Sequence, residues 1–158
     1  MTSFHFDVSD KIEGALKKML KGSVPIISTG VLADSIRDKP DWVILDSREL
    51  AEFDVSHLPD AKWVGHIDFS MLRVSDIPKD AKVVVYCSIG VRSESIAEKL
   101  LAAGFSSVWN LYGGIFTWAN EYKVLVKQNQ KSTLAVHGYN QKWARLLSHH
   151  THTCTYDT

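Results

Sequence analysis

Cys87 is the residue of this chain with the clearest chemical potential. It follows an apolar run at residues 81–86 and opens the sequence Cys-Ser-Ile-Gly-Val-Arg, which leads into a helical pattern. A loop that joins a strand end to a helix start turns several backbone N–H groups inward, and such a ring of donors binds anions. Gly90 tolerates a positive φ there, and Arg92 adds a permanent positive charge. These residues predict a nucleophilic thiolate at Cys87, with Ser93 capping the following helix.

Two simpler interpretations compete with this chemistry. A buried cysteine at the end of a core strand is a common packing residue, but the glycine and arginine that accompany Cys87 favour the nucleophile. An arginine at the start of a helix is electrostatically unfavourable. We therefore expect Arg92 to handle an anion rather than to be an ordinary surface residue.

Two charged residues, Asp46 and Arg48, lie where another apolar segment ends, within residues 42–49. Asp46 is interpreted as a buried carboxylate that accepts backbone N–H groups near the cysteine loop. Arg48 is interpreted as a structural arginine paired with Glu49 or Glu52. Both Asp46 and Arg48 are assigned supporting rather than catalytic roles.

Strands and helices are expected to alternate along the chain. Strands are predicted at residues 24–28, 42–49, 81–87 and 107–113, with a short one inside 57–66; helices are predicted at 9–22, 29–38 and 114–122, with one more ending at Gly104 and a single turn at 50–53. This alternation predicts an α/β fold with a mainly parallel central sheet and helices on both faces. Reacting groups gather at the carboxyl ends of strands in such sheets, and Cys87, Asp46 and Arg48 all fall at strand ends.

The chain divides into three parts. Residues 1–22 hold an amphipathic helix, with Ile12, Leu16 and Met19 on its apolar side, which we expect to pack on the domain formed by residues 23–122. Residues 123–158 form a C-terminal extension whose last ten or so residues lack apolar periodicity and are expected to be loose. The tail contains several potential ligands but no structural zinc spacing, so no metal site is predicted; these residues are His149, His150, His152 and Cys154.

Composition excludes some classes of protein. The 158 residues suit a single domain, and 18 basic residues balance 18 acidic ones, so no overall charge recruits nucleic acid or a membrane surface. No apolar run approaches the roughly 20 residues that span a bilayer, and the first residues lack the pattern of a secretion signal. The two cysteines, Cys87 and Cys154, lie far apart in the chain, which fits a reducing compartment. A cytoplasmic protein is expected.

Four segments of the chain, in order, resemble the rhodanese family of sulfurtransferases. Residues 87–93 are similar to the family's Cys-x-x-Gly-x-Arg-Ser loop, and residues 45–53 to its Asp-x-Arg segment that ends in Glu-Phe. Residues 56–61 resemble its Gly-His-Ile-Pro-Gly-Ala turn, and residues 110–121 its Leu-x-Gly-Gly-Ile-x-x-Trp signature. The resemblance extends over residues 24–122 and implies a single-domain rhodanese-like fold.

The resemblance also implies a mechanism. The Cys87 thiolate would attack the outer sulfur of a donor such as thiosulfate, become a persulfide, and pass that sulfur to an acceptor such as cyanide or a thiol. The family's persulfide-holding loop maps onto six residues, namely Ser88, Ile89, Gly90, Val91, Arg92 and Ser93. No metal or organic cofactor is implied. The implied partners are small sulfur donors and acceptors, with a protein thiol as one acceptor; the oligomeric state stays open.

Departures from the family pattern leave alternatives open. Ser56 and Asp60 stand where the family favours glycine, so that turn must follow another backbone path or tolerate strain. Ser88 and Ile89 are neutral where members that prefer thiosulfate often carry basic residues, which favours persulfide chemistry over thiosulfate specifically. Related phosphatases and arsenate reductases have five residues between cysteine and arginine, whereas this loop has four. The remaining alternative is a non-catalytic module that binds partners or senses sulfur or redox state.

Overall fold

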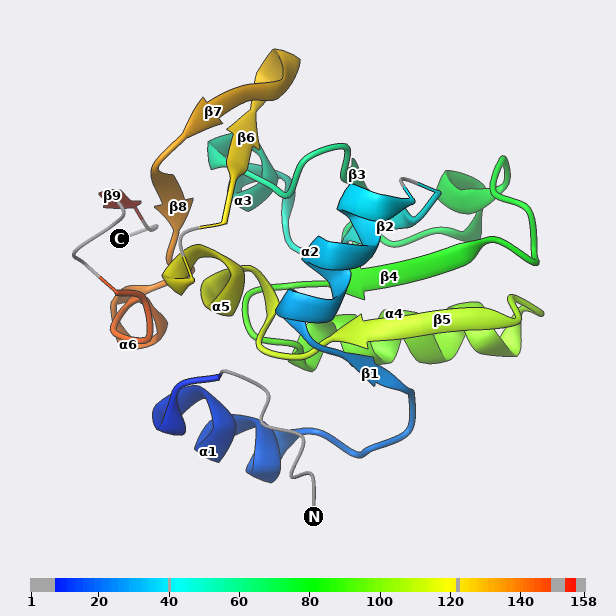
Figure 1. Ribbon diagram of the computed structural model, residues 1–158. Helices are drawn as coiled ribbons and strands as arrows, with labels where there is room; N and C mark the ends of the chain where they lie inside the picture. Colours follow the sequence, from blue (N-terminus) through cyan, green and yellow to red (C-terminus); the bar gives the residue numbers. More distant parts are fainter. Residues whose placement is uncertain (1–7, 40, 122, 149–152, 156–158) are drawn as a thin grey trace.

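The computed structural model describes residues 8–39, 41–121, 123–148 and 153–155 (Figure 1). A central sheet of five parallel strands has the order β1-β5-β4-β2-β3. The strands are β1 (Ile26–Ile27), β2 (Val43–Asp46), β3 (Lys62–Trp63), β4 (Lys82–Tyr86) and β5 (Ser107–Leu111). All are somewhat shorter than the predicted strands, but the predicted α/β fold with a parallel sheet is confirmed.

Helices cover both faces of this sheet, as predicted. On β4, Val84 and Tyr86 belong to one apolar core and Val83 and Val85 to another, because successive side chains of a strand point to opposite faces. The first core is shared with α1 (Asp10–Met19), α2 (Thr29–Asp38) and α5 (Gly114–Asn120), whereas the second is shared with α4 (Val91–Ala102). Figure 1 shows α2 in front of the sheet and α4 behind it.

The helix ends largely follow the sequence signals. Ser28 caps α2, because its hydroxyl accepts the Val31 N–H at 3.1 Å. Gly104, just beyond α4, has the positive φ of +101° expected of a helix terminator. The apolar side of α1 buries Ile12 and Leu16 as expected, but Met19 is 45% exposed, because it lies in the last turn at the edge of the packed face.

The remaining elements connect the sheet or belong to the C-terminal extension. α3 (Leu50–Val55) follows β2, and a 3-10 helix, η1 (Met71–Val74), precedes β4. In the extension, β6 (Leu125–Lys127), the 3-10 helix η2 (Gln128–Gln130) and β7 (Lys131–Thr133) form an antiparallel hairpin, followed by β8 (Ala135–His137) and α6 (Gln141–Ala144). Within the described residues, no helix is long and apolar enough to cross a membrane.

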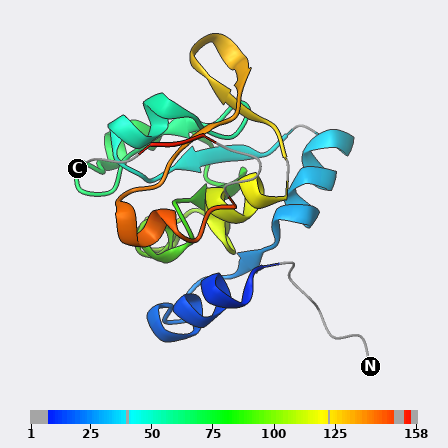
Figure 2. The same cartoon turned by 90° about the vertical axis from the view of Figure 1, so that its left-hand side faces the viewer.

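The extension returns to the edge of the sheet where the strands end. Figure 1 shows β8 and α6 on the side toward which the arrows of β4 and β5 point, and Figure 2 shows the same segments from that side. The extension is tied to the domain by two hydrogen bonds between the backbones of His57 and Val126, of 2.8 and 2.9 Å. The prediction of a loose tail is wrong for β9 (Thr153–Thr155), which pairs in parallel with β8. The three tail histidines lie outside the described residues.

Candidate active site

Cys87 lies directly after β4, at the carboxyl edge of the sheet. The residue is only 1% exposed, but its side chain borders a pocket of about 260 Å³. The Gly90 N–H donates to Cys87 Sγ at 3.2 Å, and the Ser93 hydroxyl oxygen lies 3.4 Å from the same sulfur. The thiol is therefore shielded from bulk water yet faces a hollow into which a small molecule fits.

Gly90 gives the cysteine loop its shape. Its φ is +126°, and α4 begins at the next residue, Val91. The predicted capping role of Ser93 is therefore wrong: the N-cap is Gly90, three residues earlier, which places Ser93 inside the first turn. From there the Ser93 hydroxyl donates to Asn110 Oδ1 at 2.5 Å, while the Asn110 amide donates to the Gly90 carbonyl at 2.9 Å. The side chain of Asn110 thus connects the loop to β5.

The start of α5 holds the loop from the other side. The N–H groups of Ile115 and Phe116 donate to the carbonyl oxygens of Cys87 and Ser88, both at 3.0 Å. A Cβ on Gly114 would lie 2.5 Å from each of these two oxygens, and its φ is +58°, so this close approach requires glycine. Since the C=O and N–H of a trans peptide point in opposite directions, the N–H groups that follow these carbonyls point away from α5.

Arg92 is paired with a buried carboxylate. Its two terminal nitrogens lie 2.7 and 2.9 Å from the carboxylate oxygens of Glu52, which is only 2% exposed. The guanidinium also donates to Ser88 Oγ at 2.8 Å, and its carbon lies 4.9 Å from the centre of the Tyr139 ring. Because Glu52 balances its charge, Arg92 brings little net positive charge to the pocket, and its expected role in handling an anion stays a prediction.

The two partners stabilise each other's charged form. Burial raises the pKa of Glu52, but the hydrogen bonds and charge of Arg92, with the charge of Arg48, bring this pKa below its ordinary value. Burial by itself lowers the pKa of Arg92, but the hydrogen bonds to Glu52 and the negative charge of Cys87 raise it overall. The ion pair therefore persists across the pH range in which a thiolate exists.

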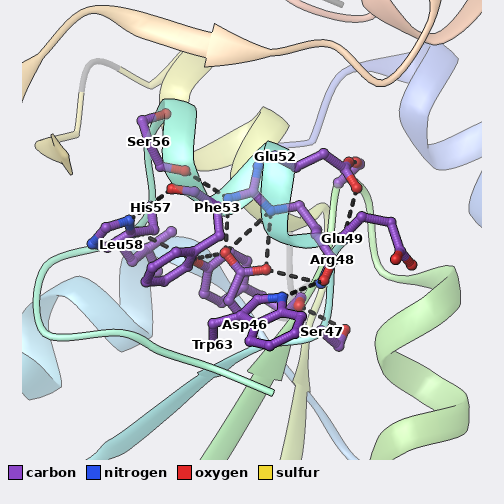
Figure 3. A network of polar contacts seen from close by, with 12 residues as sticks. Asp46, Ser47, Arg48, Glu49, Glu52, Phe53, Ser56, His57, Leu58 and Trp63 are labelled. Carbon is purple, nitrogen blue, oxygen red and sulfur yellow. Dashed lines mark hydrogen bonds and ion pairs between the residues drawn. The ribbon is translucent and has the colours of Figure 1, made fainter. Parts of the chain in front are cut away.

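Asp46 and Arg48 form a second, fully buried ion pair beneath the loop (Figure 3). Arg48 Nη2 lies 2.7 Å from Asp46 Oδ2, and the Arg48 N–H and Nε–H donate to Oδ1 at 2.9 and 3.0 Å. The predicted pairing of Arg48 with Glu49 or Glu52 is wrong, because the turn after β2 folds the arginine back onto Asp46 two residues earlier. The prediction of a buried Asp46 that accepts a backbone N–H near the loop is confirmed.

This pair fixes the turn that carries α3. The Tyr86 hydroxyl donates to Asp46 Oδ2 at 2.7 Å, and Arg48 Nη2 donates to the Ser56 carbonyl at 2.6 Å. Burial and the nearby Asp46 charge raise the pKa of Tyr86 well above its usual value, so the phenol stays a donor. The Leu58 N–H completes the network by donating to the Tyr86 oxygen at 3.1 Å. The network links β2, β4 and both ends of α3, which in turn positions Glu52.

The turn at residues 56–61 accommodates Ser56 and Asp60, which stand where the family favours glycine. Ser56 adopts an extended conformation, with φ of −169°, whereas Asp60 takes a left-handed one, with φ of +62°. Aspartate is among the residues that tolerate this region best. His57 stacks on Phe53 with ring centres 3.8 Å apart and forms a 3.0 Å hydrogen bond to its carbonyl. The His57 ring is thus anchored to α3 through Phe53.

Sequence reasoning missed the residues that wall the pocket. Besides the cysteine loop, the pocket is lined by Met19 at the end of α1, by Tyr139 after β8 and by Trp143 in α6. Apolar periodicity could mark Met19 only as a packing residue, and no motif marks the two aromatic residues. Cys154, the other cysteine, is a free thiol in β9 that lies outside this pocket lining.

No metal centre is formed by the described part of the chain. Within residues 8–39, 41–121, 123–148 and 153–155, no three His, Cys, Asp or Glu side chains gather in a way that holds a metal ion.

Comparison with known proteins agrees with this geometry. A family model described as a rhodanese-like domain matches residues 28–121. A sulfurtransferase of Allochromatium vinosum is 37% identical over 93 residues, which cover 59% of this chain and 86% of that protein. A tRNA uridine(34) hydroxylase of Enterobacter sp. (strain 638) is 30% identical over 91 residues, which cover 54% of this chain and only 26% of the hydroxylase.

A solved structure extends the likeness beyond the matched segment. The crystal structure of thiosulfate sulfurtransferase from Pseudomonas aeruginosa superimposes with a TM-score of 0.62 at 21% identity, covering 86% of this chain and 25% of that one. At this identity the superposition demonstrates a shared fold. Together with the family match and the Allochromatium relative, it shows that this chain belongs to the rhodanese family.

Proposed function

We propose that this protein is a sulfurtransferase that carries a sulfane sulfur on Cys87. One observation supports the proposal above all: Cys87 Sγ lies at the carboxyl end of β4, 3.2 Å from the Gly90 amide, and borders a pocket. A thiol that served only for packing would need neither the amide nor the hollow. The sulfurtransferase of Allochromatium vinosum, 37% identical, adds support at the level of the family.

The proposed reaction has two steps that balance without an external oxidant or reductant. The Cys87 thiolate attacks the transferable sulfur of a donor such as thiosulfate; the bond between this sulfur and the rest of the donor breaks, and its electron pair leaves with that remainder. Cys87 then carries a persulfide. A nucleophilic acceptor, such as cyanide or a thiol, attacks the outer sulfur and returns Cys87 to the thiolate. The Gly90 N–H stabilises negative charge on the sulfur in both steps.

Intact-mass measurement tests this proposal directly. The protein is incubated separately with thiosulfate, mercaptopyruvate and glutathione persulfide, and its mass is measured before and after addition of cyanide. We expect a gain of one sulfur atom with at least one donor, its removal by cyanide, and no gain in Cys87→Ser. Cys154→Ser is the matched control, because it removes a cysteine outside the pocket lining, and it should behave like the parent chain.

The opposite result identifies a different class of protein. If none of the three donors adds sulfur to the folded chain, the sulfurtransferase proposal fails. A rhodanese module that only binds partners or senses sulfur then becomes the better account of the same fold.

A further inference from the structure

We propose that the donor which loads Cys87 carries an apolar organic group next to its sulfane sulfur, in preference to the inorganic dianion thiosulfate. This inference rests on the proposed sulfurtransferase function and names the substrate class of the same pocket. It follows from three features of the described residues: the pairing of the loop arginine, the chemistry of the pocket wall, and the way the aromatic part of that wall is held.

The pocket offers little uncompensated positive charge to a dianion. Arg92 is the charged residue of its lining, and both of its terminal nitrogens contact the Glu52 carboxylate, at 2.7 and 2.9 Å. Thiosulfate brings two negative charges, and the sulfite that leaves after transfer also carries two. Burying such an anion beside a neutralised cation is unfavourable, because charges withdrawn from water require a partner.

The rest of the wall is apolar and aromatic. It includes Met19, Ile89, Val91, Tyr139 and Trp143. The volume of about 260 Å³ is far above the ~10–15 Å³ that is enough for a single water molecule, so the pocket has room for an organic group. A wall of this composition gains free energy by covering hydrocarbon and gains little from a small hydrated anion.

The aromatic wall is held in place by local structure. Tyr139 has a left-handed backbone with φ of +71°, which is uncommon for an aromatic residue, and its N–H donates to His137 Nδ1 at 2.9 Å. The neighbouring Gly138 N–H donates to the Thr155 carbonyl of β9 at 2.6 Å. Trp143 lies in the short helix α6, whose start is capped by Asn140: its Oδ1 accepts the backbone N–H of Trp143 at 3.0 Å. These contacts hold the backbone that carries both aromatic side chains of the pocket wall.

An organic persulfide, RS–SH, is a donor that satisfies these features. The Cys87 thiolate forms a bond to the outer sulfur, the RS–S bond breaks, and RS⁻ leaves with the electron pair. The donor enters uncharged, the single negative charge of the thiolate departs on RS⁻, and the group R lies against the apolar wall as the bond breaks. The same fit applies to any donor in which an apolar group adjoins the transferable sulfur.

Three donors that transfer the same sulfur atom allow the effect of donor charge on Cys87 loading to be separated from the effect of an apolar group. Thiosulfate, the methanethiosulfonate anion and the benzenethiosulfonate anion release sulfite, methanesulfinate and benzenesulfinate respectively. The last two donors carry the same charge, so their comparison isolates the apolar group. Formation of the Cys87 persulfide is followed by quenching and intact-mass measurement. Each second-order rate constant is divided by that of free cysteine with the same donor, which removes differences in intrinsic reactivity.

We expect the normalised rate constant to be about tenfold higher for benzenethiosulfonate than for methanethiosulfonate. This ratio corresponds to withdrawing about half of a phenyl ring from water. Thiosulfate should be the slowest of the three. Trp143→Ala and Tyr139→Ala should each lower the tenfold ratio toward one, as should Met19→Ala, a substitution of a half-exposed residue that leaves the fold intact. Leu134→Ala is the matched control: it lies in the same extension, is 68% exposed, is not part of the pocket lining, and should leave the ratio unchanged.

The outcomes distinguish this inference from the proposed function. If Cys87 is loaded but thiosulfate is the fastest donor, or if the two thiosulfonates react equally fast, the inference is wrong and the sulfurtransferase function stands. The inference is also wrong if all three wall variants retain the tenfold ratio. If none of these donors, nor glutathione persulfide, loads Cys87, the proposed function itself fails.

Discussion

Replacing Glu52 with glutamine tests whether this carboxylate neutralises the positive charge beside Cys87. The substitution keeps the shape of the side chain but removes the charge that lies 2.7 and 2.9 Å from the Arg92 nitrogens. At an effective dielectric constant of about 20 and a separation of roughly 8 Å, one unit of released charge attracts each negative charge of a donor by about 2 kcal/mol. Screening at physiological ionic strength reduces this to about 1 kcal/mol. We therefore expect loading by thiosulfate, relative to methanethiosulfonate, to rise about fivefold in Glu52→Gln.

The assay is the quenched mass measurement of the Cys87 persulfide with both donors at two salt concentrations. The gain for thiosulfate should shrink as salt is added, because screening weakens the released charge. Glu98→Gln is the matched control. Glu98 lies on α4, the helix that also carries Arg92, and it approaches Lys21 at 3.8 Å on the surface, so the same substitution there should leave the donor ratio unchanged.

The cost in stability is measured on the same variants. Removing one partner of a buried ion pair costs about 3–5 kcal/mol. The Arg92 side chain is 18% exposed and keeps its hydrogen bond to Ser88, so we expect a smaller loss of about 2 kcal/mol in the free energy of unfolding. A folded Glu52→Gln protein whose donor ratio does not rise, or rises equally at all salt concentrations, would refute the electrostatic reasoning.

Three further predictions concern the framework of the site. Asp46→Asn leaves the buried guanidinium of Arg48 without its counter-charge and should lower the free energy of unfolding in urea by about 3–5 kcal/mol; a loss under about 1 kcal/mol would contradict the buried pair. Gly114→Ala places a Cβ 2.5 Å from the Cys87 carbonyl oxygen, so it should destabilise the chain by about 2–4 kcal/mol and slow persulfide formation, both measured on the purified variant. Burial raises the pKa of Glu52, but its arginine partner brings this pKa below the ordinary value of 4.5. The ion pair therefore stabilises the fold fully above pH 4.5, and this stabilisation is lost as the pH falls through the lowered pKa of Glu52. Urea titrations between about pH 5 and pH 3 should show this loss, and a parallel loss in Glu52→Gln would assign it to other groups.

The sequence was sufficient to predict the sheet and the location of the cysteine. The β-branched run before Cys87 predicted a strand covered on both faces, and β4 (Lys82–Tyr86) has this property. Apolar spacing similarly predicted the helix at residues 29–38, which is α2 (Thr29–Asp38). These features depend on neighbours within a few residues, which is the range over which periodicity and capping act.

The pairing of charges could not be predicted in the same way. Glu52 and Arg92 are 40 residues apart, and only the folded chain brings α3 against the start of α4. A general signal was present, since a buried arginine requires a carboxylate, but the sequence contains several candidates for each partner. Arg48 was assigned to the wrong carboxylates for the same reason. The error over Ser93 is local: the position at which a helix starts depended on the φ of Gly90, which a sequence does not specify.

Part of the wall of the pocket beside Cys87 comes from outside the segment that matches the family. Met19 and Trp143 come from opposite ends of the chain, and both lie outside the segment at residues 28–121 that matches the family. Changes in either terminal segment are therefore expected to alter which molecules reach Cys87, while the loop at residues 87–93 stays the same. Grafting other terminal segments onto this chain is a direct way to vary the pocket without redesigning that loop.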